Sequence, residues 1–82
     1  MTLAEVVSGR RASIAGLSAG HTLMGRLGAL GLTVGAELEV LQNEGHGPLL
    51  VRVRNTRLAL GRGEAMKILV EELPDESQRA GT

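Results

Sequence analysis

Short runs in which apolar and polar residues alternate fill the second half of the chain, and they restrict it to a fold of short strands. The run from Leu49 to Arg54 reads as a strand, because an apolar side chain stands at every second position from Leu49 to Val53, so one face suits a core. The run from Arg57 to Leu60 alternates in the same way. Between them, Asn55 and Thr56 are expected to form a tight turn, because asparagine tolerates the left-handed backbone that such turns need. The two runs predict a β-hairpin.

Three more strands and one helix are predicted from the remaining pattern. Arg11–Leu17, Glu37–Val40 and Ile68–Glu71 have the length and apolar content of strands. Between the first two, leucines recur at the spacing of one helix face, and Gly31 is expected to end that helix. Five short strands with one helix after the first predict a mainly β fold closed into a small barrel. The predicted core comprises Leu27, Leu38, Val40, Val51, Val53, Leu58, Leu60 and Val70.

The composition excludes several classes of protein. The 82 residues suffice for one domain, and the chain has no Phe, Trp or Tyr, so its core must be aliphatic. The absence of cysteine excludes disulfides, thiolate metal ligands and cysteine nucleophiles, and it favours a cytoplasmic location. We expect no signal peptide and no membrane span, because the sequence has no run of about 20 apolar residues.

The charges cancel overall but are unevenly distributed. Nine basic and nine acidic residues argue against a nucleic-acid-binding protein. From residue 45 to 63, however, four arginines have no acidic residue between them: Arg52, Arg54, Arg57 and Arg62. The first three are expected near one another on the outward face of the hairpin, where they would suit an acidic partner. The simpler interpretation is that Arg52 and Arg54 pair across strands with Glu37 and Glu39.

The sequence gives no support for catalysis or for a metal site. No nucleophile has a base at motif spacing, and no glycine-rich loop joins a strand to a helix as a phosphate-binding loop does. The only histidines are His21 and His46, and nothing in the sequence places them together. We therefore expect no enzyme, no cofactor and no specific iron site.

Three stretches carry a family resemblance. The stretch 25–35 reads Gly-Arg-Leu-Gly-Ala-Leu-Gly-Leu-Thr-Val-Gly, the stretch 47–60 contains the predicted hairpin, and 65–71 contains the last turn and strand. This pattern of turns and apolar positions resembles that of the FeoA family over residues 2–73, and 74–82 would form a disordered tail. Gly25, Gly28 and Val34 stand where that family commonly has a basic residue, a leucine and a proline. The resemblance implies a five-stranded SH3-like barrel.

The resemblance also implies a function. It points to a non-enzymatic accessory or regulatory protein of bacterial ferrous iron uptake, which would bind the cytosolic side of the membrane GTPase permease carrying Fe(II). The expected partner-binding surface combines the helix with the outward hairpin face: Met24, Arg26, Leu50, Arg52, Arg54 and Arg57. The alternatives are an SH3-like module of a metal-dependent transcriptional regulator and an RNA-binding SH3-like domain. Zero net charge and the lack of aromatic residues count against RNA. Weak association of the protein with a second copy of itself is a further possibility.

Overall fold

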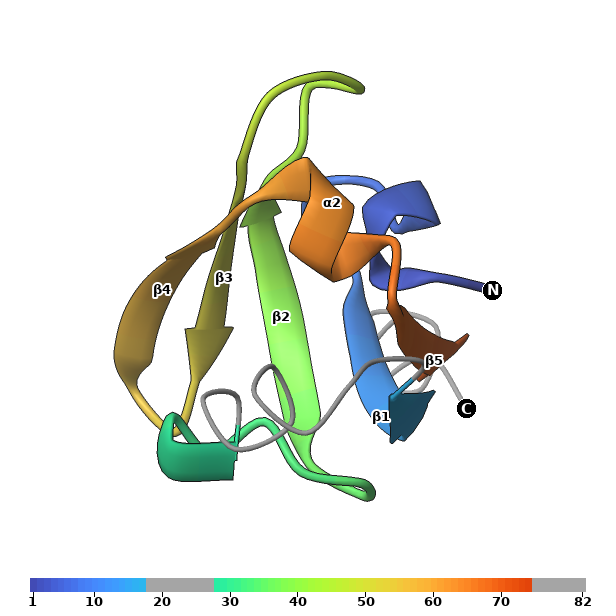
Figure 1. The fold of residues 1–82 in the computed structure, drawn as a ribbon, viewed down its shortest axis with the longest axis vertical. Coiled ribbons are helices and arrows are strands. Elements are labelled where there is room, and N and C mark those ends of the chain that lie inside the picture. Colours follow the sequence, from blue (N-terminus) through green and yellow to red (C-terminus); the bar gives the residue numbers. More distant parts are fainter. Residues whose placement is uncertain (18–27, 75–82) are drawn as a thin grey trace.

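Five antiparallel strands form a single sheet in the order β4-β3-β2-β1-β5 (Figure 1). The computed structural model describes residues 1–17 and 28–74. A short 3-10 helix, η1 (Leu3–Glu5), precedes the sheet, and a four-residue helix, α2 (Arg62–Ala65), links the two outer strands. The strands are β1 (Arg11–Leu17), β2 (Glu37–Gln42), β3 (Leu49–Val53), β4 (Thr56–Leu60) and β5 (Ile68–Glu72). The predicted mainly β fold of five strands is confirmed.

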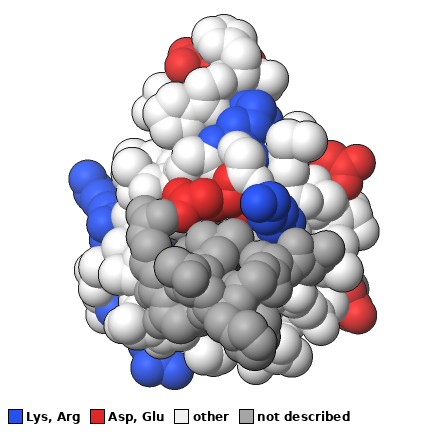
Figure 2. Space-filling view, in the orientation of Figure 1, with Lys and Arg blue, Asp and Glu red and all other residues white. Residues whose placement is uncertain are grey.

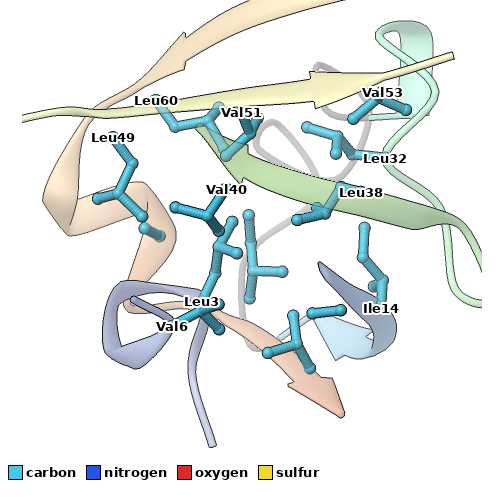
Figure 3. Packing of buried hydrophobic residues seen from close by; sticks show 14 residues of the cluster. Leu3, Val6, Ile14, Leu32, Leu38, Val40, Leu49, Val51, Val53 and Leu60 are labelled. Carbon is cyan, nitrogen blue, oxygen red and sulfur yellow. The ribbon is translucent and has the colours of Figure 1, made fainter. Parts of the chain in front are cut away.

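Aliphatic side chains from every strand and from both short helices meet in one core (Figure 3). Burial of this kind is the main source of stability in a domain without disulfides. Six of the eight predicted core residues are buried, and Leu27 lies outside the described residues. The described core consists of Leu3, Val6, Ala12, Ile14, Leu32, Leu38, Val40, Leu49, Val51, Val53, Leu60, Ala65, Ile68 and Val70.

Leu58 of the predicted core, and Leu30, which shares the predicted helix face with Leu23 and Leu27, are not fully buried. Leu58 is only half-buried, although it packs against the core, and Leu30 is 39% exposed. Leu58 belongs to β4, which is an outer strand, so no described strand covers its far side. Leu30 stands at the end of the predicted helix, one residue before the chain turns at Gly31. Alternation and helical spacing give the direction of a side chain but not the amount of structure that covers it.

The β3–β4 turn is displaced by one residue from its predicted position. Its two central residues are Arg54 and Asn55, which have φ angles of 51° and 68°, while Thr56 is already paired with Val53. A two-residue hairpin turn of this type needs a positive φ at both central positions. Asn55 occupies the second of these positions rather than the first. Arg54 therefore occupies the first position of the turn, and the strand ends at Val53.

Gly31 ends the predicted helix as expected. Gly28 and Ala29 are helical, and the Gly31 N–H donates to the Gly28 carbonyl at 3.0 Å. Gly31 has a φ of +90°, which only glycine adopts without strain, and Leu32 then turns back into the core, fully buried. The residues before Gly28 lie outside the described part of the chain. No helix within the described ranges is long and apolar enough to cross a membrane.

Candidate functional site

The outward side of β3 and β4 carries the candidate binding residues; we call Leu50, Arg52, Arg57 and Ala59 the outer hairpin face. Arg52 lies opposite Glu39 of β2 in the register, and its Nη2 donates to the Glu39 carboxylate. The predicted cross-strand pairing is therefore confirmed for this arginine. An exposed pair of this kind contributes about 0.2–1 kcal/mol. The charge of Arg52 is thus largely balanced by its own sheet.

Arg57 differs from Arg52 because it faces another cation. It lies directly opposite Arg52 in the register between β3 and β4, and like charges in that position repel. The exposed Arg54 lies in the turn rather than on the strand, which corrects the expected alternation. Within the described residues, neither Arg54 nor Arg57 has an acidic partner. In this part of the chain, the tip of the hairpin therefore carries two positive charges that no acidic side chain balances.

A shallow depression beside the outer hairpin face mixes both signs of charge. Seven residues line it: Arg11, Glu37, Leu38, Glu39, Arg52, Arg54 and Asn55. In the view of Figure 2, basic and acidic side chains are likewise scattered over the described surface. A shallow, mixed-charge depression cannot enclose a small molecule, since small-molecule sites are concave and mostly apolar. This surface suits contact with a protein better than it suits a cofactor.

Of the other candidate residues, the structure places some on the surface and leaves others outside the described part of the chain. Leu50 is half-buried and lies opposite Ala59, which gives the outer hairpin face a small apolar part. Met24 and Arg26 lie outside the described residues, so their contribution stays a prediction. His46 is exposed in the loop between β2 and β3, and His21 also lies outside the described residues. In residues 1–17 and 28–74, no group of three or more His, Cys, Asp or Glu side chains is placed to hold a metal ion.

Sequence reasoning missed a polar network at the opposite end of the sheet. Asn43 Nδ2 donates to the carbonyls of Ala4 at 3.0 Å and Val6 at 2.7 Å. Arg62 Nη2 donates to Asn43 Oδ1 at 2.5 Å, and its Nε donates to the Gly47 carbonyl at 3.0 Å. Arg62 therefore ties the N-terminal segment, the β2–β3 loop and α2 together, far from the three hairpin arginines with which its spacing grouped it. No local motif signals these contacts, because they join residues 15 to 58 positions apart.

One carboxylate at this end is hydrogen-bonded to the backbone. The Thr2 N–H donates to Glu5 Oε2 at 2.6 Å. This hydrogen bond lowers the pKa of the Glu5 carboxyl below its ordinary value of 4.5, because it favours the charged form. The same contact satisfies a backbone donor at the start of η1, as a capping box does.

Known proteins resemble this chain in sequence and in fold. "Putative Fe(2+) transport protein A" of Methanocaldococcus jannaschii is 36% identical over 70 residues, which cover 85% of this chain and 84% of that protein. A crystal structure of the iron uptake regulatory protein FeoA superposes with a TM-score of 0.84 at 32% identity, covering 89% of this chain and 97% of that one. FeoA of Stenotrophomonas maltophilia, described as an SH3 domain protein and solved with zinc, gives 0.76 at 33% identity, with coverages of 87% and 89%.

These similarities agree with the geometry. The fold is an SH3-like barrel, as FeoA of Stenotrophomonas maltophilia is described, built from one sheet of five antiparallel strands whose outer strands, β4 and β5, are not paired with each other. The sequence pattern of the FeoA domain matches residues 1–72, which is most of the chain. The chain therefore belongs to the FeoA domain family, whose members are named for ferrous iron transport.

Proposed function

We propose that this protein is a non-enzymatic accessory or regulatory protein of ferrous iron uptake, and that it binds the cytosolic portion of the Fe(II)-transporting membrane GTPase. Family membership supports the role in iron uptake. The observation that carries the binding proposal is that two arginines at the tip of the hairpin, Arg54 and Arg57, have no acidic partner among the described residues. In a chain of zero net charge, this local excess favours an acidic surface on the partner.

A domain that only binds can still regulate its partner. Such a domain acts through a difference in affinity, because it stabilises whichever state of the GTPase it binds more tightly. The outer hairpin face suits this role, since Arg52 is already balanced by Glu39 while Arg57 is available to an outside carboxylate. Leu50 and Ala59 beside them add apolar contact that salt does not screen.

The direct test is calorimetry between the full chain and the soluble cytosolic domain of the permease. Arg57→Glu should weaken binding about tenfold, mainly through the association rate, and should leave the melting temperature nearly unchanged. Lys67→Glu is the matched control, since it reverses an exposed charge next to α2, away from the hairpin. Raising the salt concentration should weaken wild-type binding more than it weakens binding of Arg57→Glu.

Two results would count against the proposal. Equal affinities of wild type and the Arg52→Glu/Arg57→Glu double variant would show that these arginines are only a solvated surface. Unfolding of Arg57→Glu would show instead that this residue has a structural role, and the interface would have to lie elsewhere.

A further inference from the structure

The two edges of the sheet are treated differently by the fold. The edge of β5 is covered by the chain's own N-terminus, because the Val70 N–H donates to the Met1 carbonyl at 2.9 Å and Thr2 bridges to Leu69. β4 stands at the other end of the strand order, and no described strand lies beyond it (Figure 1). An uncovered edge presents backbone groups that can pair with another chain.

The register identifies which backbone groups are available on β4. The two-residue turn makes Val53 and Thr56 a hydrogen-bonded pair, so the hydrogen-bonded pairs continue with Val51 and Leu58. The backbone groups of Arg57 and Ala59 consequently point away from β3. Within the described residues, nothing bonds to these N–H and C=O groups. The edge therefore offers two donors and two acceptors at the spacing of a strand.

The side chains along this edge define what an added strand should carry. Leu58 points toward the core but stays half-buried, so an apolar side chain placed beside it would extend the core. Arg57 points outward next to Arg52 and has no acidic partner within the described ranges. An acidic side chain placed beside Arg57 would offset the repulsion between the two arginines.

From these features we propose that β4 is the acceptor edge for an extended partner segment in which acidic and apolar residues alternate. Side chains alternate between the two faces of a strand, so an apolar residue would cover Leu58 while its neighbours meet Arg57 and Ala59. A second copy of this chain is a poorer occupant. Pairing β4 with itself would bring another Arg52 and Arg57 onto the same face. This inference rests on the proposed function, for which it specifies the form of the bound segment.

Peptides with methylated backbone amides can distinguish pairing with β4 from simple charge attraction. The probe is a short acetylated peptide of alternating glutamate and valine, titrated into the full chain. Two further peptides carry N-methyl groups on one or the other alternating set of amides, with the sequence and charge unchanged. One of them should lose about tenfold or more in affinity, because its blocked amides face β4, and the other should bind like the parent. Equal affinities of the three peptides, or no binding of the parent, would overturn the inference.

A substitution in the protein provides the second arm. Ala59→Pro removes the outward N–H of Ala59 without removing a hydrogen bond to β3, which edge strands tolerate. Ala59→Pro should lower the affinity for the parent peptide about tenfold, whereas Ala59→Val, which keeps the N–H, should leave that affinity unchanged. If Ala59→Pro fails to fold by circular dichroism, the methylated peptides still decide the question.

Permease-domain binding that is lost in Arg57→Glu but unchanged in folded Ala59→Pro would overturn edge pairing and leave the proposed function standing. Binding unchanged in both variants would overturn the two together.

Discussion

The two ends of the sheet are held by different means. At one end, η1, α2 and the β2–β3 loop are joined by Asn43 and Arg62, and Leu3 and Ala65 are fully buried (Figure 1). At the other end, the β3–β4 turn is exposed and two of its residues have positive φ angles. One end is held together by buried contacts and hydrogen bonds, while the other exposes the arginines at the tip of the hairpin, next to the edge of β4 that no described strand covers. Stability and binding therefore depend on different residues, which mutations can separate.

The largest expected effect comes from the core beneath the hairpin. Val53 is 2% exposed, and Val53→Asp would place a carboxylate there without a partner. An unpaired buried charge costs several kcal/mol, against a total stability of about 5–15 kcal/mol for a domain. We expect the variant to be unfolded in circular dichroism and in proton NMR. A cooperative thermal transition close to that of the wild type would contradict the assignment of Val53 to the core.

Two asparagines test the contrast between the ends. The Asn43 side chain bonds to Ala4, Val6, Gly45 and Arg62, so Asn43→Ala should lower the free energy of unfolding by about 2–4 kcal/mol. Asn55→Gly, at an exposed turn position with positive φ, should change it by less than about 0.5 kcal/mol. Urea titration of both variants measures the difference. Equal effects would mean that the polar network does not hold its end of the molecule.

The positions of most strands could be predicted from the sequence, because they depend on the pattern of neighbouring residues. Length and apolar content predicted β1 with its observed bounds and β5 to within one residue, and alternation predicted β3 and β4 to within one residue at each end. The end of the helix was also predictable, since Gly31 needs a positive φ that other residues avoid. The pairing of Glu39 with Arg52 followed from the alternation in two neighbouring strands.

What the sequence did not reveal depends on distant parts of the chain. Arg62 contacts Ala4, which lies 58 positions away, so no local pattern separates it from the arginines of the hairpin. Leu58 has the alternation of a core residue, but its exposure depends on the position of β4 at the end of the sheet. The turn was displaced because Asn55 suits either central position, and only the pairing of Val53 with Thr56 decides between them. For the candidate site, the pairing of Arg52 with Glu39 was predictable, whereas the contacts of Arg62 were not.

A smaller effect is expected from the hairpin turn. Arg54 has a φ of 51°, which costs a non-glycine residue about 1 kcal/mol, and asparagine followed by glycine is the preferred pair for this turn type. The double variant Arg54→Asn/Asn55→Gly should therefore raise the free energy of unfolding by about 1 kcal/mol in urea titration. It should also weaken binding to the permease domain, because it removes one of the two arginines that have no acidic partner in residues 1–17 and 28–74. Higher stability with unchanged affinity would exclude Arg54 from the interface and leave Arg57 in it.

The smallest effect concerns the N-terminal end and its dependence on pH. The hydrogen bond from the Thr2 N–H lowers the pKa of the Glu5 carboxyl in the folded protein, and the unfolded chain lacks this bond. A group whose pKa is lower in the folded state stabilises the fold above its unfolded pKa, and this contribution disappears as the pH falls through the folded pKa. Glu5→Gln keeps an oxygen that accepts from Thr2 but cannot titrate. We expect its melting temperature to be close to that of the wild type at neutral pH and to fall less steeply below about pH 4.5. Because Glu5 is exposed, the difference should be small. If the melting temperatures of wild type and Glu5→Gln fall equally steeply as the pH is lowered, the Glu5 carboxylate does not contribute to the pH dependence of stability.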